Sequence, residues 1–260
     1  DRKRGMTQNT TDREAAVQLP PEGCVIEFFG LPGSGKTTTA RALYLQMRDA
    51  GHTVTFAPEL TGDEFTKWKR NTIRLGLILR ALPRTWRRIP LLLDTFRVPQ
   101  KAFIDKLKAV YNSWTVLSVL AIAQPRSGYL IFDQGIAQAT WSVLLNAARD
   151  DADFLLDEYS SEPCWHIVML DLSVEKLKTR LKLRPQKHSR LQKTAGSSAD
   201  ALWIRAETLA VRIATALDAQ NNTTVQHLTS DNHAPENLAN QVLEQLDQTN
   251  RQRTPDAAVN

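Results

Sequence analysis

The chain has 260 residues, of which 42% are hydrophobic and 23% charged, and its net charge at pH 7 is +5. This composition supports a substantial domain with its own core and excludes a chain that is disordered throughout. Arginines interrupt the longest apolar region, residues 73–93, so the sequence predicts no membrane span. Its first residues carry no apolar signal core, and we therefore expect a cytoplasmic protein.

Short stretches rich in apolar, β-branched and aromatic residues alternate with helical patterns along the chain. Strands are predicted at 24–29, 53–56, 129–132, 166–172 and 223–228, and helices at 35–51, 139–150, 173–183, 199–220 and 235–246. Such alternation is typical of a parallel sheet with right-handed helical crossovers. The predicted fold class is α/β, with three layers, about five parallel strands and helices on both faces.

The two ends of the chain and one long crossover depart from this pattern. Residues 1–20 and 248–260 are polar and aperiodic, which predicts disordered ends around a single domain at 21–247. The crossover at 57–127 is far longer than one helix requires. We expect it to hold two or three helices packed over the sheet as an enlarged insertion.

Residues 30–37, Gly-Leu-Pro-Gly-Ser-Gly-Lys-Thr, match the phosphate-binding pattern G-x-x-x-x-G-K-[ST] between a predicted strand and a predicted helix. Glycines let backbone N–H groups converge on phosphate oxygens at the positive end of the helix. Lys36 is then expected to neutralise the terminal phosphates, and the Thr37 hydroxyl to ligate Mg²⁺. The predicted cofactors are ATP and Mg²⁺, held by Gly30, Pro32, Gly33, Ser34, Gly35, Lys36, Thr37 and Thr38.

A second carboxylate for the magnesium shell is expected at the end of another strand, where Asp133 follows Tyr-Leu-Ile-Phe. The alternative is an ordinary strand-end Asp that begins a turn. The next residue is Gln134 rather than the glutamate that many ATPases use to orient water, and the GTPase pattern Asn-Lys-x-Asp does not occur. Both features favour a kinase over a hydrolase or a switch.

These motifs carry a resemblance to a known family. Gly30 to Thr38, Asp133-Gln-Gly135 and a basic segment from Arg180 to Arg190 resemble the thymidylate kinase-like and deoxynucleoside kinase-like branch of the P-loop kinases, over residues 24–230. The resemblance implies phosphoryl transfer from ATP to a nucleoside or nucleotide. Members usually have Asp-Arg or Glu-Arg where this chain has Asp133-Gln134, so one transition-state arginine of the family is missing from that position.

The resemblance also implies a mobile lid at 179–199. Guanidinium groups that close over the donor stabilise the charge of the transferring phosphoryl group. Arg184 and Arg190 are the predicted catalytic residues of the lid, and Arg180 is a predicted nucleotide contact. The alternative is a solvated basic helix end.

The acceptor side is predicted from the end of the second strand. Related kinases carry a carboxylate beside a proline there, usually as Glu-Pro, whereas this chain has Pro58-Glu59. Glu59 is the predicted catalytic group that orients or deprotonates the acceptor. Asp63 and Glu64 are competitors nearby, and a solvated acidic turn is the alternative.

The segment 67–97 combines positive charge with apolar side chains. It holds nine Lys or Arg against one acid, Asp94, and so carries a local charge of +8. Trp68, Trp86 and Phe96 could stack on a base, and the cations could hold an anionic small molecule, a polynucleotide or the surface of a membrane. A solvated charged face is the alternative. We expect the segment, including Arg84 and Arg88, to serve the acceptor side rather than ATP.

The sequence therefore predicts an ATP-dependent kinase with a small, anionic acceptor. A nucleoside or nucleotide is the first choice of acceptor, and another alcohol, such as a sugar or an antibiotic, is an alternative acceptor. Two alternatives are a polynucleotide 5′-hydroxyl kinase and a non-catalytic nucleotide-binding adaptor that docks on a membrane or a protein partner through 67–97. The sequence does not predict the oligomeric state.

Overall fold

A computed structural model describes residues 23–100, 102–124, 127–147, 156, 159, 164–183, 191, 197–231 and 233–253. Its centre is a five-stranded parallel sheet in the order β2-β3-β1-β4-β5. The strands are β1 (Cys24–Phe29), β2 (Val54–Phe56), β3 (Tyr129–Phe132), β4 (Trp165–Asp171) and β5 (Thr223–Thr229). The predicted number and direction of the strands are confirmed.

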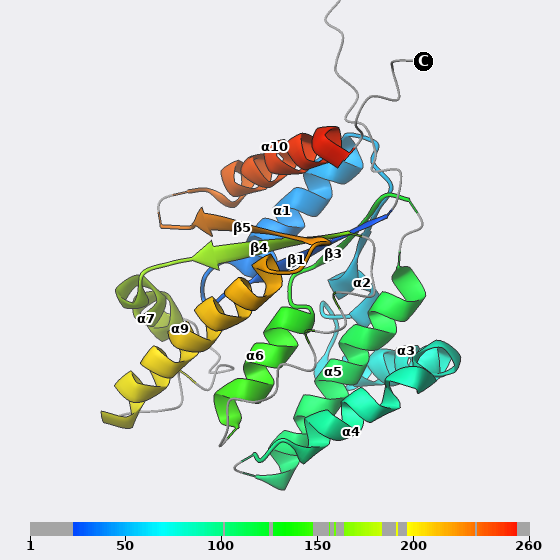
Figure 1. Ribbon diagram of the computed structural model, residues 1–260, viewed down its shortest axis with the longest axis vertical. Coiled ribbons are helices and arrows are strands. Elements are labelled where there is room, and N and C mark those ends of the chain that lie inside the picture. The colour runs from blue at the N-terminus through cyan, green and yellow to red at the C-terminus, as the bar shows by residue number, and fades with distance from the viewer. Residues whose placement is uncertain are drawn as a thin grey trace, which may run out of the picture.

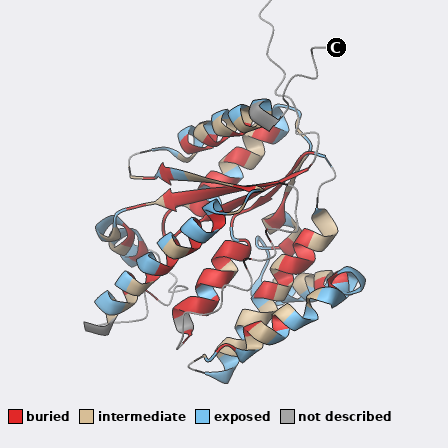
Figure 2. Ribbon diagram, viewed as in Figure 1, coloured by how far each residue is buried: buried red, intermediate tan, exposed pale blue. Residues whose placement is uncertain are grey.

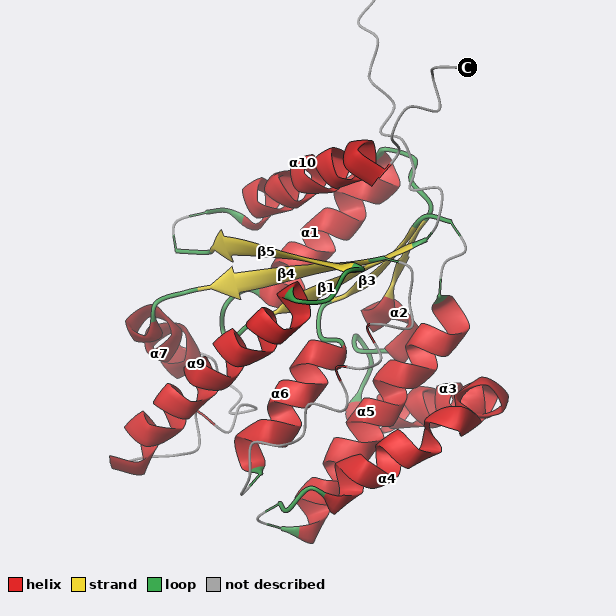
Figure 3. Ribbon diagram, in the orientation of Figure 1, coloured by secondary structure: helices red, strands yellow, loops and turns green. Residues whose placement is uncertain are grey.

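Helices cover both faces of the sheet (Figure 1). One face carries α1 (Lys36–Asp49) and α10 (Pro235–Arg253), and the other carries α5 (Phe103–Ala123), α6 (Ile136–Asn146) and α9 (Ser197–Asp218). The shorter α7 (Val174–Leu183) follows β4. The three layers are clearest when helices and strands are coloured separately (Figure 3). Because α10 continues to Arg253, the prediction of a disordered end beginning at residue 248 is wrong for 248–253.

The buried core lies in two layers, one on each side of the sheet (Figure 2). Alternate residues of β1 enter different layers: Val25 and Phe29 pack toward α5, α6 and α9, whereas Ile26 and Phe28 pack toward α1 and α10. A strand buried on both faces is expected in a parallel sheet with crossover helices. Glu27 falls in this series and is completely buried, although it is acidic.

The long crossover contains more helices than the sequence predicted. It holds α2 (Ala57–Thr61), α3 (Lys67–Thr85), the 3₁₀ turn η1 (Trp86–Arg88), α4 (Ile89–Arg97) and α5. Only α5 contributes a long buried face to the core beside β3 and α6, while α3 and α4 pack against α5 on its outer side. The predicted helical insertion is thus present, but α3 and α4 lie outside α5 rather than directly over the sheet. None of the described helices is both long and apolar enough to cross a membrane.

Candidate active site

The loop at 30–37 joins β1 to α1 and turns through three glycines with positive φ. These angles are 143° at Gly30, 98° at Gly33 and 101° at Gly35, a region that side chains strongly disfavour. A Cβ at Gly30 would also lie 2.6 Å from the carbonyl oxygen of Leu170 on β4. Glycine is thus required by both conformation and space, and the loop reaches the N-terminus of α1 as the motif predicts.

Lys36 folds back over this loop. Its Nζ donates hydrogen bonds to the carbonyl oxygens of Gly30, at 2.8 Å, and Leu31, at 3.0 Å. The side chain is buried, so its charge is held beside the loop rather than in solvent. The hydroxyl of Ser34 is also buried here and has no hydrogen-bond partner. A cation, a spare hydroxyl and a helix N-terminus together form a cradle that fits a polyphosphate.

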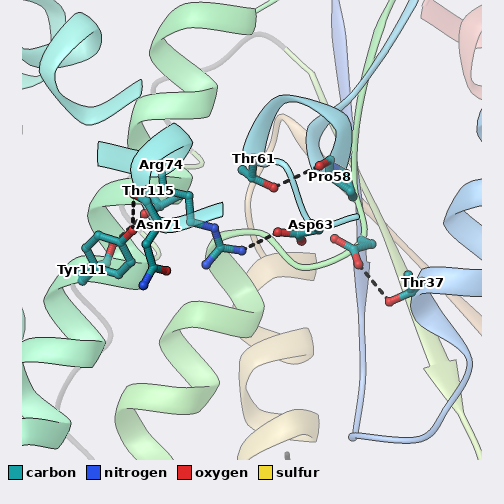
Figure 4. Close-up of polar contacts among 9 residues, drawn as sticks. Thr37, Pro58, Thr61, Asp63, Asn71, Arg74, Tyr111 and Thr115 are labelled. Carbon is teal, nitrogen blue, oxygen red and sulfur yellow. Dashed lines mark hydrogen bonds and ion pairs between the residues drawn. The ribbon is translucent and has the colours of Figure 1, made fainter. Parts of the chain in front are cut away.

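Thr37 and Asp133 meet across the cleft, 96 residues apart in the sequence. The Thr37 hydroxyl donates a 2.8 Å hydrogen bond to Oδ2 of Asp133 (Figure 4). Burial raises the pKa of Asp133, and the bond from Thr37 opposes this rise. A hydroxyl and a carboxylate are hard oxygen donors of the kind that Mg²⁺ prefers. Within the described residues no cluster of three or more His, Cys, Asp or Glu forms a protein-only metal site, so a metal here would need oxygens from substrate and water.

The side chain of Glu27 on β1 holds the segment that follows β3 through hydrogen bonds to its backbone. Its carboxylate accepts hydrogen bonds from the backbone N–H groups of Gly135 at 3.1 Å, Ile136 at 3.0 Å and Gln138 at 3.2 Å. The Tyr159 hydroxyl donates a fourth bond, at 2.5 Å. Burial raises the pKa of Glu27 from 4.5 to about 7, because removing the charge from water outweighs these bonds. This carboxylate thus ties β1 to the first turn of α6, directly after Asp133.

Two neighbouring cavities, which we name for the predicted donor and acceptor sides, form a cleft beside the phosphate-binding loop. The donor cavity, of about 400 Å³, is bordered by Gly33, Lys36, Thr37 and Trp141. The acceptor cavity, of about 500 Å³, extends from Asp133 toward α2 and α3. Both are lined by the same five residues of α5, α6 and the segment between β3 and α6: Ala109, Asn112, Gln134, Gln138 and Ser142. A molecule in the acceptor cavity would therefore border the space beside Lys36 and Thr37.

The acceptor cavity carries two cations and an acid from the long crossover. Arg70 and Arg74 of α3 line it, together with Asp63 from the turn after α2. Arg74 Nη2 lies 2.7 Å from Asp63 Oδ1, and the two side chains point toward each other in Figure 4. The Nε atoms of Arg70 and Arg74 are buried without a hydrogen-bond partner. Such donors suit an anionic group on an acceptor.

Several acceptor-side residues lie differently from the prediction. Glu59 is exposed on α2, accepts a 3.2 Å hydrogen bond from the Tyr44 hydroxyl and does not line the cleft. Trp68 and Trp86 are exposed on the outside of the crossover, where they cannot stack on a base in the cleft. Among the described aromatic residues the acceptor cavity is bordered by Phe132 alone. The segment 67–97 is therefore divided, since Arg70 and Arg74 face the cavity whereas Arg84 is exposed and Arg88 does not line it.

The predicted lid is only partly described. Arg180 of α7 reaches the phosphate-binding loop, with Nη1 3.5 Å from the carbonyl oxygen of Gly33 and Nη2 3.3 Å from that of Ser230. Arg180 thus lies beside the phosphate-binding loop, and its contact with a nucleotide stays a prediction. Arg184 and Arg190 lie outside the described residues.

Solved structures of other proteins resemble the fold of this chain. Thymidylate kinase from Candida albicans has a TM-score of 0.50 and 14% sequence identity, covering 90% of this chain and 94% of its own. Deoxyadenosine kinase from M. mycoides with bound dCTP has a TM-score of 0.47 and 12% identity, covering 86% and 99%. This chain has a thymidylate kinase-like P-loop fold. The sequence itself matches no protein-family model and no curated protein.

Proposed function

We propose that this protein transfers the terminal phosphoryl group of Mg·ATP to a small anionic acceptor. The observation that carries the proposal is the pair of neighbouring cavities with five lining residues in common, one beside Lys36 and Thr37 and the other lined by Asp133, Arg70 and Arg74. Donor and acceptor can thus lie side by side, which is the main requirement of phosphoryl transfer. When bound, Mg·ATP supplies the phosphoryl group and the charge of the metal.

Each residue has a role that follows from its place. Lys36 can exchange its two carbonyl partners for phosphate oxygens, so its charge remains beside the transferring group. Thr37 and Asp133 offer oxygens to the metal, and Arg180 borders the donor. In the transfer, the bond from the terminal phosphorus to its bridging oxygen breaks as a bond to an acceptor oxygen forms. If that oxygen belongs to a hydroxyl, Asp63 is the cleft carboxylate that can receive its proton.

Arg70 and Arg74 support an anionic acceptor, because their buried Nε atoms have no hydrogen-bond partner among the described residues. A nucleoside monophosphate is the leading candidate, since the fold is shared with a protein named thymidylate kinase. The lining offers many amides and hydroxyls beside its single aromatic ring, so a phosphorylated sugar or a related polyol is the main rival. Arg184 and Arg190 are proposed to close over the donor.

The test is a screen of nucleosides, nucleoside monophosphates, sugar phosphates, uncharged sugars and oligonucleotides with Mg·ATP, read as a gain of one phosphoryl group by mass spectrometry. We expect transfer to a small anion and none from the Asp133→Asn variant. Transfer only to uncharged alcohols would contradict the role of Arg70 and Arg74. Transfer only to oligonucleotides would replace the proposal by the polynucleotide kinase alternative.

A further inference from the structure

Exposed apolar side chains gather on one part of this molecule. Of the 14 large hydrophobic residues that are exposed in the described part of the chain, 11 lie between residues 65 and 107. Single exposed apolar residues are common on protein surfaces, but contiguous patches mark sites of interaction. Figure 2 shows exposed positions following each other along α3 and α4, on the side away from the sheet. This region therefore needs a separate explanation from the cleft.

Within α3 the spacing of these residues places them on one face. Along α3, Trp68, Leu75, Leu79 and Leu82 follow each other at intervals of seven, four and three residues, which is the repeat of a single helix face. Trp86, Ile89 and Leu93 continue the same intervals through η1 and α4. A different face of α3, about a quarter turn around the helix, carries Ile78 and Ala81, which are buried. The apolar stripe is thus not part of the core, because α3 already has a buried face.

Positive charge accompanies the stripe. We define the α3–α4 surface as these seven apolar residues together with the exposed cations Lys67, Lys69, Arg80, Arg84, Arg87 and Arg97. Two cations lie against aromatic rings, since Lys69 Nζ is 3.6 Å from the ring centroid of Phe65 and the Arg87 guanidinium is 5.5 Å from that of Trp86. The one acid in 67–97, Asp94, forms a 2.8 Å ion pair with Arg97.

We infer that the α3–α4 surface binds the surface of an anionic lipid membrane. A helix that lies in the plane of a membrane needs this combination, with aliphatic side chains and Trp entering the boundary of the acyl chains while Lys and Arg contact anionic headgroups. Long cationic side chains can also extend around an apolar stripe to reach the headgroups. The membrane is contacted and not crossed, which agrees with the described helices.

Two other occupants fit less well. A symmetric dimer through this surface would bring the cations of one copy against the same cations of the other, with one acid in the segment to offset them. A nucleic acid would satisfy the cations and could stack on Trp68 and Trp86, but it would leave Leu75, Leu79, Ile89 and Leu93 without an apolar partner. An anionic membrane satisfies both kinds of side chain.

The test is flotation of the full chain with phosphatidylcholine vesicles, with and without phosphatidylglycerol. We expect binding to the anionic vesicles that weakens in high salt and is at least about tenfold weaker to pure phosphatidylcholine. The variant Leu79→Ser/Trp86→Ser should weaken binding about tenfold or more. Its matched control is Ile204→Ser/Val211→Ser on α9, because these residues are exposed to a similar extent, 65% and 59% against 61% and 58%.

A charge variant separates the two contributions. Arg80→Gln/Arg87→Gln should weaken binding to anionic vesicles about tenfold, while Arg41→Gln/Arg251→Gln, which removes two exposed cations elsewhere, should change it about twofold at most. Melting temperatures and affinity for an ATP analogue show that each variant is folded, and they keep this test separate from that of the proposed kinase activity.

Four outcomes would overturn the inference. The first is no binding of the natural sequence to anionic vesicles, and the second is binding that the α3–α4 variants and their controls reduce equally. The third is a dimer in analytical ultracentrifugation that only Leu79→Ser/Trp86→Ser abolishes, without vesicle binding. The fourth is tight, salt-sensitive binding of an oligonucleotide without vesicle binding.

Discussion

The two ends of the cleft are built in different ways. At the donor end one continuous stretch, Gly30 to Thr37, provides the glycines, the cation and the helix N-terminus. At the acceptor end Asp63, Arg70 and Arg74 come from the long crossover that precedes β3 in the sequence. Gln134 and Gln138 come from the segment that follows β3. A site made of consecutive residues can be found by its spacing. A site assembled from separate elements depends on how those elements pack.

The largest effect on activity is expected from a substitution at the donor end alone. Lys36→Met should lower phosphoryl transfer by about 100-fold or more, since a charge beside the transferring group in a water-poor cleft contributes about 3 kcal/mol to the transition state. Lys67→Met, which removes an exposed cation on α3, is the matched control and should change turnover about twofold at most. Turnover is measured with the acceptor from the screen, together with the melting temperature. Near-natural turnover in Lys36→Met would refute the donor-site assignment.

A second prediction concerns Glu27, which supports the segment shared by both ends. The folded protein keeps a proton on Glu27 up to about pH 7, whereas the unfolded chain loses it near pH 4.5. The folded state therefore binds more protons in this window, and its stability falls as pH rises from about 4.5 to 7, by about 3 kcal/mol from this residue. Glu27→Gln should remove that part of the pH dependence.

Urea unfolding from pH 4.5 to 7.5 measures this effect for the natural sequence, for Glu27→Gln and for Glu236→Gln, which alters an exposed acid in the first turn of α10. The control should follow the natural pH dependence. If the difference in stability between Glu27→Gln and the natural sequence is constant with pH, the carboxyl does not hold its proton as the structure implies.

A third prediction sharpens the comparison at the acceptor end. Arg74→Gln should raise the KM for the acceptor about tenfold, or about 1.4 kcal/mol, through loss of a charged hydrogen bond, while the KM for ATP stays within about twofold. Arg80→Gln, on the same helix but exposed, should leave both constants unchanged. Steady-state kinetics with each substrate varied in turn gives both values. A rise in the KM for ATP alone would place Arg74 at the donor end.

The smallest effect is expected at Glu59, and comparison with the nearby Asp63 shows which of the two carboxylates acts on the acceptor. Glu59→Gln should change kcat about twofold at most, because Glu59 bonds to Tyr44 outside the cleft. Asp63→Asn should lower kcat for a hydroxyl acceptor about tenfold or more, since Asp63 lines the acceptor cavity. Steady-state kinetics of the two variants and the natural sequence measures both changes in kcat. The reverse order of effects would restore Glu59 as the group that orients the acceptor.

The sequence predicted the strands and the phosphate-binding loop because their signals are local: apolar runs, glycine spacing, and a lysine at the start of a helix. It could not predict that Glu59 turns toward Tyr44, because this depends on how α2 lies beside α1. Nor could it predict that Arg74 faces the cleft while Arg80 faces outward, because this depends on how α3 packs against α5. The sequence contains one indication of the role of Glu27, which is that this acid lies within an otherwise apolar predicted strand. Its partner Tyr159 is 132 residues away, and only the fold brings the two together.

The carboxyl group of Glu27 also affects where a phosphate group can bind. Two helices, α1 and α6, begin beside the cleft, and the N-terminus of any helix attracts anions through its unpaired N–H groups. At α6 the buried carboxyl group of Glu27 already accepts bonds from the N–H groups of Gly135, Ile136 and Gln138. At α1 the same kind of site follows Gly35 without a side-chain cap. The side chain of Glu27 thus occupies the N-terminus of α6 and leaves the N-terminus of α1 for the phosphates of the proposed donor.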